Sequence, residues 1–391
     1  LGNQALSGVF RSKNIDDILS SPLNLCQCTK CNLVQLQHSY PLDEMYNESY
    51  GYRSGATMYM KNHLNNIIEF AKKNTSLRKG DYVLDIGSND GTLLSCYPKE
   101  KYNRVGIDPV AKKYLDLYDN DIKVVTDFFN IDNYLSVASQ KAKIVTSISM
   151  FYDLEEPVKF AQEVASILDV KGVWVFEQSY LPAMLRQNSY DTICHEHLEY
   201  YSLNAIEYIM KQAGLTIIDA SQNEVNGGSI RLAAVRLDSP SSSNVSPEAI
   251  SLMEQEKNHN IHSIATFRSF QENAERQKTD LIKLLHELKK AGKTVVGYGA
   301  STKGNVILQY CGISTDLLSC IGDITPFKDG TYTPGTKIPI VSMEKAKAMK
   351  PDYFLVLPWG FRSDILLREK GDALNQGIKM IFPLPFVEIV S

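Results

Sequence analysis

The sequence predicts an α/β protein in which helices cover a mostly parallel sheet. Short apolar runs at 82–86, 104–107, 122–125, 144–149 and 172–177 alternate with helical stretches at 91–97, 109–118 and 156–168. This alternation is typical of a parallel sheet with helices on both faces. A helix is expected first, at 56–73, where apolar residues recur at helical spacing. A second strand–turn–helix unit begins at Thr294, so the chain is expected to contain two such units.

The remaining elements lie on either side of a segment rich in serine and proline, 239–247. A helix at 204–213 and strands at 215–220 and 229–236 are expected before it. A long polar helical stretch at 247–291, with a break near 259–262, is interpreted as a connector. Strands at 318–322, 338–341 and 353–357 follow. The expected domains are an N-terminal module (1–52), a first α/β domain (53–238), a linker with a long helix (239–292) and a second α/β domain (293–391).

The composition excludes several classes of protein. Of the 391 residues 43% are hydrophobic and 22% are charged, and the net charge of −4 predicts no general affinity for nucleic acid or for an anionic membrane. No apolar run is long enough to span a membrane, and no secretory signal pattern is present. Seven cysteines, an odd number in a long chain, favour a reducing compartment. The expected location is therefore cytoplasmic.

The turn after strand 82–86 has the pattern of a nucleoside-cofactor site. Glycines at 87 and 91 let the backbone approach a ligand, and Asp108, about twenty residues later, can accept hydrogen bonds from ribose hydroxyls. Asp90 in this turn would repel a pyrophosphate but tolerate a cation, which favours S-adenosylmethionine over a dinucleotide and therefore methyl transfer. The expected cofactor-binding residues are Tyr52, Ser54, Asp85, Gly87, Asn89, Asp90, Gly91, Asp108, Pro109 and Asp127. A surface acid remains the alternative for Asp127, and ordinary loop chemistry for 52–55.

The turn at 297–304 has the opposite electrostatic character. It contains Ser301, Thr302 and Lys303 and no acid. Backbone amides at a helix start, two hydroxyls and a lysine favour a phosphorylated ligand. A plain tight connection is the alternative. Trp359, one of two tryptophans, is expected either to stack on a nucleotide base or to fill the second core.

Segment 191–202 is the densest cluster of proton-handling groups, and it follows strand 172–177 on the side where ligands of open α/β sheets bind. The methyl donor is already electrophilic, so the protein must generate the nucleophile. A carbon nucleophile requires removal of a proton next to a carbonyl, which suits a histidine near neutral pH. His197 or His195 is the candidate base, with Glu196 beside it. A metal site and a structural histidine pair remain alternatives.

Two further segments are expected near this cluster. Glu177 and Tyr180, at the end of a central strand, are expected to face one cleft. Gly227 and Gly228 permit close approach of a ligand, and Arg231 could meet a phosphate or a carbonyl; an ordinary turn with a surface arginine is the alternative.

These motifs together resemble those of the sugar C-methyltransferases of deoxysugar biosynthesis, which methylate a nucleotide-linked 4-keto sugar at the carbon beside the ketone. The resemblance spans essentially the whole chain. It rests on segments 1–8, 28–36, 52–54, 85–91, 191–197, 227–231, 297–305 and 334–339.

The resemblance implies a class I S-adenosylmethionine-dependent methyltransferase domain between a small N-terminal zinc module and a C-terminal Rossmann-like domain. The implied partner is a nucleotide-diphosphate sugar, and the implied base is His197, with Glu196, His195 and Cys194 around it. The family has a tyrosine where this chain has Cys194, so the accepted sugar or the stabilisation of its enolate is expected to differ. The expected substrate-binding residues are Glu177, Tyr180, Arg231, Ser301, Thr302, Lys303 and Asn305.

The zinc module is incomplete in this sequence. A structural zinc site generally uses two Cys-x-x-Cys pairs, and Cys28 with Cys31 forms one of them. The second pair is expected upstream of Leu1. We expect a monomer or small homo-oligomer. The alternatives to C-methyl transfer are an O-methyltransferase acting on a sugar hydroxyl and a non-catalytic nucleotide-sugar-binding protein.

Overall fold

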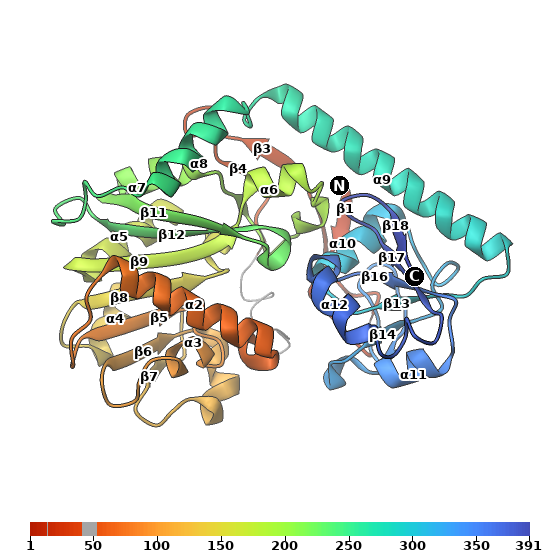
Figure 1. Cartoon of the computed structure of the whole chain (residues 1–391), viewed down its shortest axis with the longest axis horizontal. Helices are drawn as coiled ribbons and strands as arrows, with labels where there is room; N and C mark the ends of the chain where they lie inside the picture. The colour runs from red at the N-terminus through yellow and green to blue at the C-terminus, as the bar shows by residue number, and fades with distance from the viewer. Residues whose placement is uncertain (14, 41–52) are drawn as a thin grey trace.

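The computed structural model describes all residues except 14 and 41–52, and two large sheets lie side by side in it (Figure 1). The first sheet contains residues between 82 and 236, and the second contains residues between 295 and 390. None of the helices in the described ranges combines the length and the apolarity that a membrane span requires.

The first sheet has the strand order β11-β12-β9-β8-β5-β6-β7. Its strands are β5 (Tyr82–Ile86), β6 (Asn103–Ile107), β7 (Lys123–Val125), β8 (Ala142–Ile148), β9 (Leu168–Ser179), β11 (Leu215–Asn223) and β12 (Ser229–Arg236). Strands β5 to β9 pair in parallel, as predicted, whereas β12 is antiparallel to both β9 and β11. The short connection between β11 and β12 explains this, because adjacent parallel strands need a long crossover.

Helices cover this sheet on both faces (Figure 1). They are α2 (Met58–Asn74), α3 (Thr92–Ser95), α4 (Ile131–Val137), α5 (Pro157–Ile167) and α7 (Leu203–Gln212), whereas the short α6 (Leu181–Arg186) contacts α9. The helix expected at 109–118 is instead the 3-10 helix η2 (Pro109–Leu117), with a non-helical residue at Tyr114. The helix expected at 91–97 is only one turn long, and α4 was not predicted.

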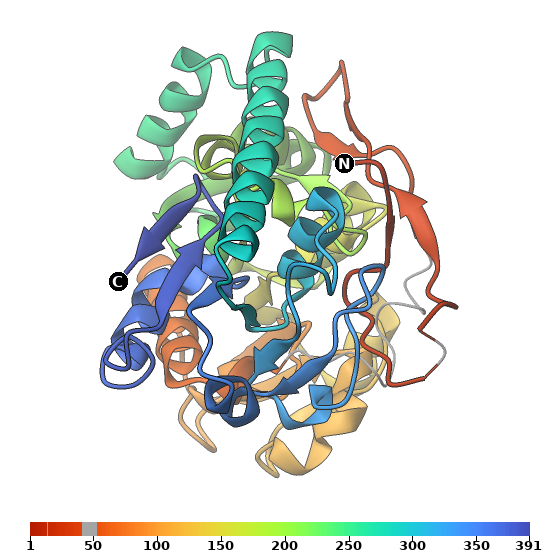
Figure 2. The ribbon, with the colours of Figure 1, turned by 90° about the vertical axis from the view of Figure 1, so that its right-hand side faces the viewer.

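The long helical stretch is divided where the sequence predicted a break. Helix α8 (Pro247–Asn258) ends before α9 (Ile264–Lys290), and the Ser263 side chain caps the start of α9 by accepting from Thr266 N. Helix α9 extends from the first sheet across the second (Figures 1 and 2). Its buried residues include Phe270, Ala274, Leu281, Leu285 and Leu288, which belong to the core of the second sheet. Helix α9 is therefore a packing element as well as a connector.

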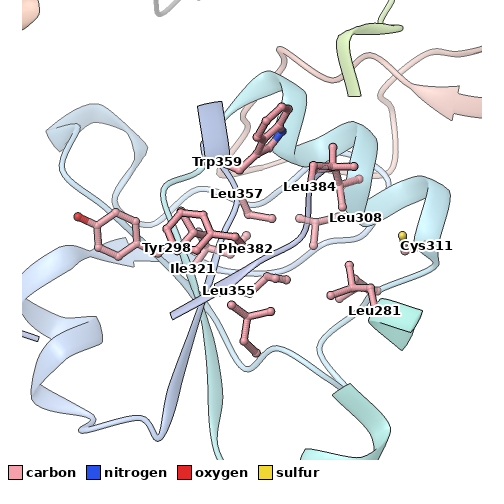
Figure 3. Packing of buried hydrophobic residues seen from close by; sticks show 14 of the residues in the cluster. Leu281, Tyr298, Leu308, Cys311, Ile321, Leu355, Leu357, Trp359, Phe382 and Leu384 are labelled. Atoms are coloured by element: carbon pink, nitrogen blue, oxygen red, sulfur yellow. The ribbon is translucent and has the colours of Figure 1, made fainter. Parts of the chain in front are cut away.

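The second sheet has the order β15-β14-β13-β16-β17-β18. Its elements are β13 (Val295–Tyr298), α10 (Thr302–Cys311), β14 (Ile321–Asp323), β15 (Ile340–Ser342), α11 (Met343–Ala348), β16 (Tyr353–Val356), α12 (Arg362–Glu369), β17 (Lys379–Phe382) and β18 (Glu388–Val390). Strands β17 and β18 were not predicted, and β18 closes the edge in antiparallel orientation. Trp359 lies at one end of this core, far from Leu281 (Figure 3).

The N-terminal segment packs beside the second sheet rather than forming a separate body. It contains β1 (Asn3–Ala5), β2 (Ser20–Pro22), β3 (Leu25–Gln27) and β4 (Val34–Leu36), and β4 also pairs with β10 (Glu199–Tyr200). The Gln309 side chain of α10 bonds both N and O of Ala5, at 2.8 and 3.1 Å. This segment therefore lies against the second unit and against β10, which belongs to segment 191–202.

The expected zinc site is not supported. Within the described ranges, no cluster of three or more His, Cys, Asp or Glu side chains is arranged to hold a metal ion. Cys28 and Cys31 are free, partly buried thiols that contact each other and pack beside the core of the first sheet.

Candidate active site

A cavity of about 660 Å³ lies where the carboxyl ends of strands from both sheets meet. Open α/β sheets bind ligands at this edge. The lining comes from the N-terminal segment, from the first unit and from the second unit. Thirteen of the predicted site residues line it: Ser54, Asp85, Gly87, Asn89, Asp108, Pro109, Glu177, Cys194, Glu196, His197, Ser301, Thr302 and Lys303.

Asp85 is the acid that faces the cavity from the end of β5. Its carboxylate is 4% exposed and accepts a hydrogen bond from the Thr146 hydroxyl at 2.6 Å. Burial raises the pKa of Asp85 to about 7, because a charged carboxylate loses its hydration there. Gly87, at φ +74°, brings the backbone to the same wall, beside Met150. A cationic ligand would offset the cost of ionising Asp85.

Asp108 is held in a fixed orientation at the end of β6. Its Oδ2 accepts from Asn89 N at 2.7 Å and its Oδ1 accepts from Val110 N at 2.6 Å. Each carboxylate oxygen keeps a second lone pair, which is what binding the two hydroxyls of a ribose requires.

Three of the expected cofactor residues lie elsewhere. The Asp90 carboxylate accepts from Gly55 N, Arg53 and Thr92, so protein donors occupy the acid that was expected to face a cation. Gly91 packs against the Tyr118 ring, and Asp127 is an exposed loop acid that accepts from the amide of the next residue. Of these two acids, Asp85 and not Asp90 lines the cavity. Tyr52 lies outside the described residues, whereas Ser54 N donates to Asn89 Oδ1 at 3.0 Å.

Of the two histidines in segment 191–202, His197 is the one that lines the cavity. It follows a turn in which its N–H donates to Cys194 O, and its ring lies 4.2 Å from the Tyr152 ring, centroid to centroid. Its Nδ1 lies 3.0 Å from Thr192 O. A carbonyl only accepts, so Nδ1 carries the proton and Nε2 is left as a basic nitrogen.

Lys303 lies in the same wall as His197, although it comes from the second unit. Its ammonium donates to Asn226 O at 2.7 Å. Burial lowers the pKa of Lys303, and the Asp191 carboxylate opposes that shift. Burial and the Lys303 charge together lower the pKa of His197 to about 3, so the imidazole is neutral at physiological pH. Lys303 therefore lies close enough to His197 to affect its pKa, and the phosphate role expected for Lys303 stays a prediction.

Glu196 and Cys194 complete this wall. Ser7 Oγ of the N-terminal segment lies 3.5 Å from Glu196 Oε2, and Gly8 lies against the same carboxylate. The Cys194 thiol is 1% exposed and contacts Glu196, and its pKa is raised by burial and by that charge. The thiol is therefore neutral.

His195 is not part of the cavity. Its Nε2 lies 3.1 Å from Ser21 O and its ring packs edge-on against Tyr40. Because it points toward the N-terminal segment, His195 has a structural role there, and of the two histidines only His197 can meet a ligand in the cavity.

Glu177 lines the cavity together with His63, a residue that the sequence analysis missed. Glu177 Oε1 lies 2.5 Å from His63 Nε2, and Oε2 accepts from Arg231 Nε at 2.8 Å and from Asn223 at 2.9 Å. Although burial opposes ionisation of Glu177, these partners lower its pKa. His63 could have been recognised from the sequence, because it lies on the buried face of the helix predicted at 56–73.

Arg231 and Tyr180 do not have the expected substrate contacts. Arg231 is directly opposite Glu177 in the pairing of β12 with β9, so both side chains lie on one face and form an internal ion pair. Tyr180 lies three residues after Glu177, which places it on the other face of an extended segment. Its hydroxyl donates to Glu256 at 2.7 Å.

Three further contacts involve expected site residues or the glycine pair and are made to other parts of the protein. The Asn305 amide donates to Ser7 O at 2.7 Å and is fully buried, so it holds the N-terminal segment. Gly228 packs against Ala183, and Gly227 against the Trp359 ring. This glycine pair therefore lets other segments of the same chain pack closely, and not a ligand.

Asp191 and Trp359 form a contact that no local pattern predicted. Trp359 Nε1 donates to Asp191 Oδ2 at 2.7 Å, and both residues line the cavity. Trp359 is 8% exposed and belongs to the second core, which was one of the two roles expected from the sequence. The indole therefore holds Asp191, whose carboxylate faces Lys303.

Comparison with known proteins agrees with this geometry. A family model described as "Methyltransferase domain" matches residues 59–220, and one described as "C-methyltransferase C-terminal domain" matches residues 224–385. The C-methyltransferase NovU of Streptomyces niveus is 29% identical over 372 residues, which cover 95% of this chain and 88% of that protein.

Solved structures are similar to less of the chain. A chain of the complex between the Haloferax volcanii Trm112 methyltransferase activator and a putative methyltransferase is 16% identical, with a TM-score of 0.35, and the match covers 46% of this chain and 92% of that one. A putative methyltransferase from Bacillus halodurans is 11% identical, with a TM-score of 0.35, over 44% of this chain and 98% of that one. Similarity at this level carries no further argument.

The fold, the acids at the ends of β5 and β6 and the family models define an S-adenosylmethionine-dependent methyltransferase of class I. The second family model and the relative from Streptomyces niveus are both described as C-methyltransferases, which transfer the methyl group to carbon. The chain belongs to the S-adenosylmethionine-dependent C-methyltransferases, which confirms the C-methyltransferase part of the resemblance seen in the sequence.

Proposed function

We propose that this C-methyltransferase acts on a nucleotide-diphosphate-linked 4-keto sugar and that His197 removes the proton from the carbon beside the ketone. The observation that carries the proposal is the His197 ring, which has its Nδ1 proton committed to Thr192 O and lies in one cavity with Lys303, Asp85 and Asp108. The basic nitrogen of His197, the ammonium of Lys303 and the two acids proposed to bind the cofactor thus line one cavity.

The residues of the first unit fit S-adenosylmethionine. Asp85 would face the cationic end of the cofactor, and Asp108 would accept hydrogen bonds from its ribose hydroxyls. Gly87 has no side chain, so the cofactor can approach the backbone there. When bound, the cofactor supplies an electrophilic methyl group that a carbanion beside the ketone can accept.

His197 and Lys303 suit the formation of that carbanion. Proton transfer from carbon to His197 Nε2 creates an imidazolium and an enolate, and the ammonium of Lys303 lies beside the same ring. Before the transfer the imidazole is neutral and only Lys303 is charged. After the transfer, the negative charge of the enolate lies beside two positive charges, the imidazolium and the ammonium. The arrangement therefore stabilises the transition state more than the ground state, which is the requirement for catalysis.

The second unit fits the nucleotide part of the substrate. Ser301 caps α10, accepting from Gly304 N at 3.0 Å, and lines the cavity with Thr302. Hydroxyls and free amides at a helix start favour an anion such as a diphosphate. The sugar would then lie between this helix start and His197.

Exchange of the sugar's α-hydrogen tests the proposal directly. In deuterium oxide, without methyl donor, a nucleotide 4-keto sugar that the enzyme accepts should gain deuterium at the carbon beside the ketone. His197→Asn should slow both exchange and methyl transfer by about 10²–10⁴-fold, the usual contribution of a general base. Proton NMR and mass spectrometry measure both rates.

His195→Asn is the matched control, because that ring lies outside the cavity and contacts Ser21 O. It should keep exchange and transfer close to the wild-type rates. Methyl transfer without any exchange, with the new methyl group on oxygen, would show an O-methyltransferase instead. Near-normal turnover by His197→Asn would remove His197 from the role of base.

A further inference from the structure

The two units repeat one hydrogen-bonded arrangement at the cavity. In the first unit, Gly87 begins the turn after β5 at φ +74° and its N–H donates to Ile107 O at 2.9 Å. The next residue, Asp108, accepts from Asn89 N of the turn at 2.7 Å and from Val110 N, two residues ahead, at 2.6 Å.

The second unit contains the same set of contacts. Gly299 begins the turn after β13 at φ +79° and its N–H donates to Gly322 O at 2.7 Å. The next residue, Asp323, accepts from Ala300 N of the turn at 2.6 Å and from Thr325 N, two residues ahead, at 2.7 Å. Asp323 ends β14 and lines the cavity at 8% exposure, as Asp108 does at 7%.

The surroundings of the two acids differ in charge. Asp108 shares its wall with Asp85, which suits a cationic ligand. Asp323 instead adjoins the start of α10, because Ala300 N, its donor, immediately precedes Ser301. Lys328 Nζ lies 4.0 Å from Asp323 Oδ2 and donates to Ala300 O at 2.6 Å. A ribose at Asp323 would therefore have its phosphates next to hydroxyls, amides and an ammonium.

We propose that Asp323 binds the vicinal hydroxyls of a ribose, so that the sugar carrier used by this enzyme is a ribonucleoside diphosphate rather than a 2′-deoxyribonucleoside diphosphate. This inference rests on the proposed nucleotide-sugar function and specifies the nucleotide. Two backbone N–H groups fix the carboxylate of Asp323 and leave one lone pair on each oxygen. Those two lone pairs match two neighbouring hydroxyls, and a 2′-deoxyribose offers only one of them.

Calorimetric titration of the full chain, saturated with S-adenosylhomocysteine, tests the inference. The ligands are UDP, GDP, CDP and ADP, each compared with its 2′-deoxy counterpart, together with dTDP. The tightest ribonucleotide should bind at least about tenfold more tightly than its 2′-deoxy form, because one hydrogen bond to a charged group is lost. Asp323→Asn should reduce that preference severalfold while S-adenosylhomocysteine affinity is unchanged.

Asp108→Asn is the matched control in the other unit and should weaken S-adenosylhomocysteine binding while leaving the ribose preference intact. Equal affinities for ribo and 2′-deoxy forms in the unmodified protein would overturn the inference and leave the proposed sugar methylation standing. A preference that persists in Asp323→Asn would also overturn it. Binding of S-adenosylhomocysteine without binding of any of these diphosphates would overturn both the inference and the nucleotide part of the proposed function.

Discussion

Asp85 and His197 are both enclosed by the cavity, and burial disfavours the charged form of each. For Asp85 this raises the pKa to about 7, and for His197 burial together with Lys303 lowers it to about 3. At pH 7 His197 is therefore neutral and Asp85 is only partly ionised. A ligand of opposite charge, a cation beside Asp85 or an anion beside His197, would favour the charged form of each. The proposed function would supply both charges, the cation from the methyl donor and the anion from the enolate.

The shifted pKa of Asp85 predicts a pH-dependent affinity for the cofactor product. S-adenosylhomocysteine lacks the sulfonium but keeps the ammonium of its amino-acid end. An ammonium beside Asp85 favours the ionised carboxylate, so binding releases a proton below about pH 7 and affinity rises with pH. Affinity for S-adenosylhomocysteine, measured by calorimetry, should fall up to about tenfold per pH unit below 7. Asp85→Asn should bind more weakly and lose this dependence.

Asp90→Asn is the control for that experiment. The Asp90 carboxylate already contacts Gly55, Arg53 and Thr92 outside the cavity, so the pH dependence should persist in this variant. An unmodified protein whose affinity is constant from pH 5.5 to 8 would contradict the role of Asp85.

At the scale of elements, the short 3-10 helices η5 (Val225–Gly227) and η7 (Trp359–Phe361) join the units at the catalytic wall. A Cβ at Gly360 would lie 3.2 Å from Gly227 N, so both backbones approach closely there. This contact places Asn226 O at Lys303 and the Trp359 indole at Asp191. The second unit thereby influences the electrostatics around His197, which belongs to the first unit.

Trp359→Phe should therefore impair catalysis as well as stability. The loss leaves the buried Asp191 carboxylate without its indole donor, which should cost about 1–3 kcal/mol in the free energy of unfolding. The hydrogen bond from Trp359 also lowers the pKa of Asp191, so its loss makes the carboxylate that faces Lys303 harder to ionise. We therefore expect kcat to fall about tenfold or more. Urea unfolding and steady-state kinetics measure the two effects.

The other tryptophan of the chain provides the comparison for this prediction. Trp174 Nε1 donates to Ser147 at 2.8 Å, fully buried in the first core and away from the cavity. Trp174→Phe should lower the free energy of unfolding by a similar amount while kcat is retained. Equal loss of kcat in both variants would mean that only stability is involved.

The elements also show where local patterns were sufficient. Alternating apolar runs predicted β5, β6, β8 and β13, and the α8–α9 break was predicted because polar residues interrupt the helical pattern. Short strands such as β18, with partly exposed residues, have no such pattern. Glu177 and Tyr180 were assigned to one cleft by proximity in the chain, whereas side chains three residues apart in a strand face opposite sides.

At the scale of the whole molecule, one hydrophobic core crosses the units. The cluster around the second sheet includes Leu23 of the N-terminal segment, Leu181 and Tyr190 of the first unit, and Leu281 of α9. The cavity therefore lies between parts that share a core and are expected to unfold together.

Leu281→Ala tests that shared core. Leu281 is fully buried, so its truncation should lower the free energy of unfolding by about 2–5 kcal/mol. Tyrosine and tryptophan fluorescence and circular dichroism should report a single, shifted urea transition. Leu367→Ala, at a residue that is 76% exposed on α12, should change stability by less than about 0.5 kcal/mol. Two separated transitions in the unmodified protein would contradict the shared core.

The sequence by itself determined the α/β class, both glycine turns and the acid at 108, because strand periodicity and turn chemistry are local properties. It also indicated S-adenosylmethionine, but through Asp90, whose carboxylate is occupied by protein donors. Only the tertiary structure decided that Asp85 rather than Asp90 faces the cavity, that His195 turns away, and that Lys303 meets His197. Those outcomes depend on the direction of single side chains and on the packing of segments far apart in the chain, and neither leaves a periodic trace in the sequence.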